Sequence, residues 1–73
     1  MAHDRIVTDP TIMFGKPVVR GTRITVEHIL RKLASGVSPE DIVRDHPGLS
    51  VEDIRAAQAF AADYLSDEEI MIS

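Results

Sequence analysis

The sequence predicts a mainly α domain, with three short helices that follow a short N-terminal β ribbon. A six-residue cassette, which reads apolar, Ser or Thr, small, Glu, polar, Ile, occurs three times between residues 24 and 54. Residues 6–19 are instead rich in β-branched side chains and are interrupted by proline and glycine. The first pattern is typical of helix starts, and the second is typical of short strands joined by turns.

Each cassette places a hydroxyl where a helix is expected to begin. Thr25, Ser38 and Ser50 are the expected N-caps, because a cap hydroxyl accepts a hydrogen bond from a backbone N–H that lacks a partner in the first turn. The acids that follow lie where the helix dipole favours negative charge. Gly36 and Pro47 are stop signals for the first and second helices. The expected helices span about residues 26–35, 39–46 and 51–65.

Apolar residues recur at helical spacing on the first and third segments, which predicts the faces that these helices bury. The first face comprises Val26, Ile29, Leu30, Leu33 and Ala34. The third comprises Ile54, Ala57, Phe60, Ala61, Tyr64 and Leu65, and the second segment offers mainly Ile42 and Val43. Three short helices with tight connections also suit a helix-turn-helix, in which the third would be the recognition helix.

The ribbon is expected to pair residues 6–8 with residues 17–19. Pro17 fits a strand start or edge, because proline has no N–H to donate to a ladder. Gly15 and Gly21 are expected to supply turn conformations that a Cβ disfavours. An isolated two-stranded ribbon is marginal in water, so it must pack on the helices or pair with another chain, and pairing across a dimer is the favoured expectation.

The chain has 73 residues, which is enough for one small domain but not for a multidomain enzyme. We expect a ribbon and turn over residues 1–23, a three-helix core over 24–65 and a tail over 66–73. A core of this size is marginal, so we also expect a homodimer. No apolar run approaches the length of a membrane span and the N-terminus lacks the layout of a signal peptide, so the expected location is the cytoplasm.

Little in the sequence points to catalysis or to a cofactor. The chain has no cysteine, which excludes disulfides and thiolate zinc sites. Its histidines, His3, His28 and His46, lie too far apart in sequence for a local metal motif, and no nucleophile is placed beside them. We therefore expect a protein that is not an enzyme and that binds no metal or cofactor, and a small hydrolase is the least favoured alternative.

The charges are divided unevenly along the chain. Residues 1–32 carry six basic and three acidic side chains, whereas residues 33–73 carry two basic and nine acidic ones. The basic part suits an anionic partner and the acidic part suits a basic one.

Three segments of the sequence are distinctive: the block GKPVVRGTR at residues 15–23, and the runs LASGVSPEDI at 33–42 and HPGL at 46–49. Together they resemble the bacterial domain of unknown function 433, over about residues 5–64. The resemblance implies a homeodomain-like helical fold with a small N-terminal β element.

Members of that family are similar to VapB-type antitoxins and are often encoded beside a PIN-like ribonuclease. The resemblance therefore implies the antitoxin of a type II toxin–antitoxin system, which neutralises a PIN-like nuclease by direct binding, with repression of its own operon as a second role. The alternative is a DNA-binding transcriptional regulator without a toxin partner.

The third helix is a poor match to a DNA reader, because it begins Val51-Glu52-Asp53 and offers only Arg55 and Gln58 near its start. Contacts from the ribbon and the first helix are preferred. The DNA-binding candidates are Lys16, Arg20, Arg23, Arg31, Lys32 and Arg55. For Arg23 a structural role is favoured over contact with a phosphate or the toxin: its guanidinium would pin the ribbon to a carboxylate such as Glu27 or Asp53, or cap the end of another helix.

The tail combines three acids with an apolar triplet, and it has two readings. In one, Ser66 and Glu69 start a further helical turn, and Ile70 and Ile72 cover the domain's own core. In the other, the tail meets a basic groove on the nuclease. The toxin-binding candidates are Asp67, Glu68, Glu69, Ile70, Met71 and Ile72.

Overall fold

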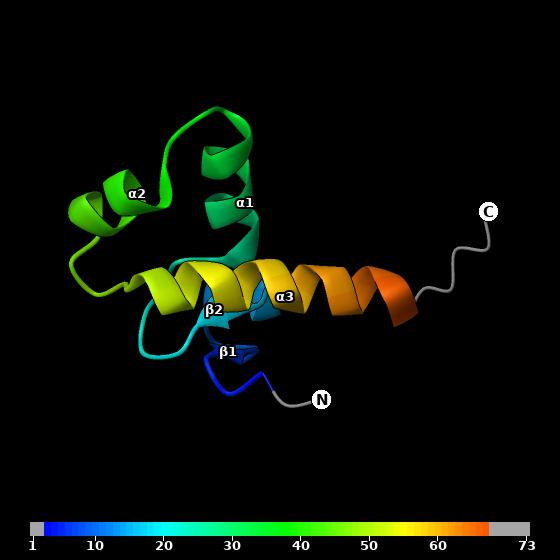
Figure 1. Cartoon of the computed structure of the whole chain (residues 1–73). Coiled ribbons are helices and arrows are strands. Elements are labelled where there is room, and N and C mark those ends of the chain that lie inside the picture. Colours follow the sequence, from blue (N-terminus) through cyan, green and yellow to red (C-terminus); the bar gives the residue numbers. More distant parts are fainter. Residues whose placement is uncertain (1–2, 68–73) are drawn as a thin grey trace.

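The computed structural model describes residues 3–67, and its helices and strands confirm the mainly α class with an N-terminal ribbon (Figure 1). In chain order the elements are β1 (Ile6–Val7), a 3₁₀ turn η1 (Met13–Gly15), β2 (Val18–Val19), α1 (Val26–Ala34), α2 (Pro39–Asp45) and α3 (Val51–Asp67). The long helix α3 contacts α1, α2 and β1, and its C-terminal end runs out past the other elements (Figure 1). None of the helices formed by the described residues has both the length and the apolar content that crossing a bilayer requires.

The three expected hydroxyl caps are confirmed. Thr25 Oγ1 accepts a hydrogen bond from the backbone N–H three residues along at 2.9 Å, and Ser38 Oγ does the same at 3.1 Å. At the start of α3 the bonding is reciprocal, because the Asp53 N–H donates to Ser50 Oγ at 3.2 Å while the Ser50 N–H donates to Asp53 Oδ2 at 3.0 Å. These bonds satisfy N–H groups that a helix start leaves without partners.

The helix ends agree less closely with the sequence. Gly36 ends α1 in the left-handed conformation at a φ of 95°, and its N–H donates to the Leu33 carbonyl. Helix α3 continues through Ser66 to Asp67, two residues beyond its expected end, so Ser66 lies inside the helix and does not start a further turn as one interpretation of the tail had it. Neither glycine nor proline interrupts the chain there, and serine is tolerated inside a helix.

The ribbon forms within one chain, whereas pairing across a dimer was the favoured expectation. Its strands are antiparallel, with Ile6 opposite Val19 and Val7 opposite Val18. Each strand has only two residues, but Ile6, Val18 and Val19 are buried, and Val18 also bridges Thr25 at the start of α1. Packing against the helices therefore stabilises a ribbon that would be marginal by itself.

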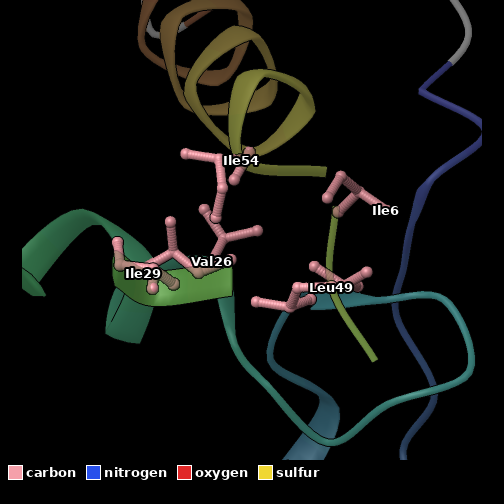
Figure 2. Close-up of a cluster of buried hydrophobic side chains, with 8 residues drawn as sticks. Ile6, Val26, Ile29, Leu49 and Ile54 are labelled. Atoms are coloured by element: carbon pink, nitrogen blue, oxygen red, sulfur yellow. The ribbon is translucent and has the colours of Figure 1, made fainter. Parts of the chain in front are cut away.

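The core lies where β1, β2 and the three helices meet, and Figure 2 shows its central side chains. Its fully buried members include Ile29 of α1, Ile42 of α2 and Ile54 of α3. The expected buried face of α3 extends only as far as Phe60 and Ala61, which are partly buried, while Tyr64 and Leu65 are 59% and 58% exposed. For Tyr64 and Leu65 the sequence prediction was wrong, because they lie beyond the residues of α3 that pack on the core.

The cap at Ser38 yields a stability prediction. Replacing Ser38 with Ala removes the only side-chain acceptor at the start of α2 within the described residues, so the free energy of unfolding should fall by about 1 kcal/mol. Urea denaturation measures this change. Ser66→Ala, an exposed change inside α3, should alter stability by less than about 0.5 kcal/mol. Equal effects of the two substitutions would contradict the assigned cap.

Candidate functional site

The loop between the two strands presents an aromatic side chain to solvent. Phe14 is 95% exposed. Its backbone is left-handed at a φ of 58°, between Met13 at 48° and Gly15 at 81°. For residues other than glycine this conformation costs of order 1–3 kcal/mol, and such strain clusters at functional positions. The sequence analysis did not single out Phe14, although an aromatic residue inside a turn was the available signal.

The first corner of this loop is held by Asp9. Its carboxylate accepts hydrogen bonds from the Thr11 hydroxyl at 2.7 Å and the Thr11 N–H at 2.8 Å. These bonds, the hydroxyl first, hold the pKa of Asp9 below its ordinary value. The far corner is Gly15, and Gly21 has a φ of 80° after β2, so both expected turn glycines are left-handed.

Two of the DNA-binding candidates share one carboxylate. Lys16 Nζ lies 3.0 Å from Glu27 Oε1, and Arg31 Nη2 lies 3.1 Å from Glu27 Oε2. These hydrogen bonds, from Lys16 first and then from Arg31, hold the pKa of Glu27 below its ordinary value of 4.5. The ion network links the residue after the loop to the exposed side of α1, and it partly neutralises both cations.

Arg20 and Arg23 lie on either side of Gly21, and both side chains are exposed. Arg20 Nε donates to the Asp4 carbonyl at 2.7 Å. Within residues 3–67, Arg23 makes neither of the contacts considered for it, because Lys16 binds Glu27 and Arg5 binds Asp53 instead. The structural reading of Arg23 as a clamp on those carboxylates was therefore wrong.

The Arg5 contact was missed by the sequence analysis. Arg5 Nη1 lies 3.0 Å from Asp53 Oδ1. The other oxygen of this buried carboxylate accepts a hydrogen bond from the Ser50 N–H. The pair therefore ties the chain before β1 to the first turn of α3. The two residues are 48 positions apart, so no local sequence pattern predicted this pair.

The remaining candidates are more scattered. Lys32 lies in the last turn of α1, and Arg55 is exposed on α3. Asp67 is the last residue of α3, and the other toxin-binding candidates, residues 68–72, lie outside the described part of the chain. His28 and His46 meet edge to face with ring centroids 5.8 Å apart, but no group of three metal-ligating side chains forms among residues 3–67.

An open apolar groove of about 570 Å³ lies between the ribbon, α1 and the second half of α3. Val26, Leu30 and Ala34 form its α1 side, and the α3 side comprises Phe60, Ala61, Tyr64 and Leu65. Phe60 and Tyr64 stack with centroids 6.3 Å apart. Lys16 and Pro17 close the ribbon end, where the Lys16–Glu27–Arg31 network also lies. The groove's size is that of a ligand or side-chain pocket.

The N-terminal segment also contacts the α3 wall of the groove. His3 Nε2 lies 2.8 Å from Asp63 Oδ2, and the His3 ring meets Phe60 edge to face at 5.5 Å. These contacts hold the residues before β1 against α3.

Fold and site together define a small three-helix domain that carries an antiparallel ribbon and an apolar groove beside it. Residues 6–61 match the family described as Protein of unknown function (DUF433). The chain belongs to this family, which confirms the resemblance seen in the sequence.

Two relatives extend the comparison. The chain is 38% identical over 60 residues to "Uncharacterized protein y4eO" of Sinorhizobium fredii; the match covers 82% of this chain but only 27% of that protein. The chain therefore spans about a quarter of its curated relative. The crystal structure of a DUF433 member protein from Anabaena variabilis is similar with a TM-score of 0.79 at 28% identity, over 92% of this chain and 68% of that one.

The Glu27 network predicts a pH dependence. Because the folded-state pKa of Glu27 lies below 4.5, its ion pairs stabilise the fold above pH 4.5, and this contribution is lost as the pH falls through the lower folded-state value. In an NMR titration of the Glu27 carboxyl, Lys16→Met should raise the midpoint toward 4.5, and by more than Arg31→Met does. Lys32→Met, which removes a neighbouring cation without this contact, should leave it in place. An unchanged midpoint in Lys16→Met would contradict the network.

Proposed function

We propose that this protein is the antitoxin of a type II toxin–antitoxin pair and that it neutralises a PIN-like ribonuclease by direct binding. The observation that carries the proposal is the end of α3. None of residues 58–66 is buried, yet the helix continues to Asp67 and leads into the acidic and apolar tail. A helical segment without its own core gains stability from a partner, because isolated helices of this length are marginal in water.

The charge of the C-terminal end of α3, residues 58–67, supports a nuclease as that partner, and we call this segment the arm. Among described residues, the last turn of α3 carries no basic side chain, and the sequence continues from Asp67 into Glu68 and Glu69. A ribonuclease binds the anionic RNA backbone through a basic surface. An acidic arm is complementary to such a surface and competes for it with the substrate.

The apolar triplet of the tail supports the same assignment. Ile70, Met71 and Ile72 directly follow the acids in the sequence. Interfaces typically combine a central group of apolar anchors with a polar or charged rim. In this mechanism the acids steer the tail to the basic surface, and the apolar residues hold it there.

Co-expression with a PIN-like nuclease encoded by the adjacent gene is the experiment that tests the proposal. The full chain should relieve the growth arrest that the nuclease causes, and it should bind the purified nuclease. Ile70→Asp combined with Ile72→Asp should raise the Kd by about 30-fold or more, because apolar anchors are lost. The matched control is Thr8→Asp with His28→Asp, which adds the same charges at exposed positions outside both α3 and the tail.

Two results would contradict the antitoxin role. The first is a growth arrest that the full chain does not relieve. The second is equal loss of affinity in the tail variant and in its control, since the binding would then not depend on the tail.

Operator binding is a second candidate, favoured by Arg20 and Arg23, which are exposed on the two sides of one tight turn. Ribbons of this kind enter DNA grooves in β-type readers. The first turn of α3 is less suited to phosphates, because it carries Glu52 and Asp53. A DNA-binding protein without a toxin would use the same turn.

A gel shift on the protein's own promoter, repeated at several salt concentrations, tests the ribbon contact. Arg23→Ala should weaken binding and reduce the slope of log affinity against log salt by about 1, as expected for one lost phosphate contact. Arg55→Ala removes the same charge from α3 and should change neither quantity. The absence of a salt-sensitive complex would eliminate operator binding, and a larger effect of Arg55→Ala would move the contact to α3.

A further inference from the structure

The groove is built to take an apolar side chain. Its walls are aliphatic and aromatic, and the charges at its ribbon end are already occupied, because Glu27 holds both Lys16 and Arg31. The Glu27 carboxylate offsets one of these two exposed cations, so the charge left at the ribbon end is small beside the apolar surface of the walls. An apolar occupant would lose water-exposed surface on both sides of the contact, which is the main favourable term in association.

The chain itself presents a side chain of that kind. Phe14 is 95% exposed, and three consecutive left-handed residues hold it out from the loop. Lys16, two positions further along, lines the groove, so the Cα of Phe14 lies within about 7.6 Å of a groove residue. The loop that bears the exposed ring therefore adjoins the ribbon end of the groove, yet Phe14 is not among the residues that line its own groove.

We propose that the groove binds Phe14 of a second copy of this chain, while its own Phe14 enters the groove of that copy. A two-fold dimer uses the same surface patch on both subunits, so the patch must contain both halves of each contact. A ring beside a groove satisfies this requirement. The inference does not rest on the antitoxin role, and it concerns the isolated protein.

The charges around the groove are complementary under this exchange. The loop that carries Phe14 leads into the basic block with Lys16, Arg20 and Arg23, whereas the opposite wall of the groove lies on the acidic end of α3, beside Asp63. Insertion brings the basic ribbon of one copy toward the acidic end of α3 in the other. Arg31 at the groove edge also places a cation near the inserted ring, an attractive arrangement.

The exchange of Phe14 rings would also cover apolar side chains at the end of α3 that the single chain leaves exposed. Tyr64 and Leu65 line the groove and are more than half exposed in the single chain. A partner ring packed against them would remove this surface from water. Because a domain of this size has a small core, such coverage would add substantially to its buried apolar surface.

Sedimentation equilibrium of the full chain, without nuclease or DNA, tests the dimer. The wild type should show a concentration-dependent equilibrium between one and two copies. Phe14→Ala removes two anchors from each dimer and should raise the dissociation constant by about 100-fold or more. Ala34→Arg, at an exposed position of the groove wall, should do the same by obstructing the groove. Ala59→Arg, the same change at an exposed position of α3 outside the groove, should leave the dimer intact.

Mixing the two defective variants gives a sharper test. Phe14→Ala keeps a working groove and Ala34→Arg keeps Phe14, so one of the two insertions is restored in a mixed pair. The mixture should form heterodimers at concentrations where each variant alone is monomeric. Phe14→Trp gives a second readout, because the chain has no other tryptophan, and its emission should move to shorter wavelength as dimer forms.

Circular dichroism melts of each variant check that the fold is retained, and Phe14 is so exposed that its replacement leaves the core untouched. A wild type that stays monomeric at its solubility limit would overturn the proposal. So would a dimer that survives Phe14→Ala, or one that Ala59→Arg breaks, since the interface would then lie elsewhere. None of these results bears on neutralisation of the nuclease, which depends on the tail.

Discussion

One small core constrains the whole structure, and it reaches only the first half of α3. Ile29, Ile42 and Ile54 bring the three helices together, and β1 and β2 close the core from the ribbon side. The last fully buried residue of α3 within the described chain is Ala57, ten residues before the helix ends. Beyond it Phe60 still packs at the edge of the core, whereas Tyr64 and Leu65 are more than half exposed. Both the groove and the projecting arm follow from this limit.

The start of α3 is fixed by internal electrostatics instead of being offered to a ligand. Asp53 is buried, caps Ser50 and binds Arg5, so its carboxylate is fully used within the fold. A buried carboxylate requires such partners, because leaving it unpaired is costly. Two exposed cations, Arg20 and Arg23, instead lie on either side of the turn after β2. The helix that a helix-turn-helix would use for recognition therefore has the wrong charge at its start, and the ribbon is the better candidate for an anionic partner.

The two apolar regions that the core leaves uncovered suit different partners. The groove is apolar and adjoins the loop that bears the exposed Phe14, and we propose a second copy of the chain as its partner. The arm at the end of α3 leads into acidic residues and fits a basic surface.

The sequence by itself determined the elements that local chemistry specifies. Hydroxyl caps at Thr25, Ser38 and Ser50, the stop at Gly36 and the left-handed turns at Gly15 and Gly21 depend on residues a few positions apart, and all are present. Only the tertiary structure decided which apolar residues are buried, because the spacing of Tyr64 and Leu65 marks a helix face but not what faces it. The tertiary structure alone also decided the ion pairs of Arg5 with Asp53 and of Lys16 with Glu27. These contacts join distant segments, and their partners are selected by how the chain packs and not by any pattern along it.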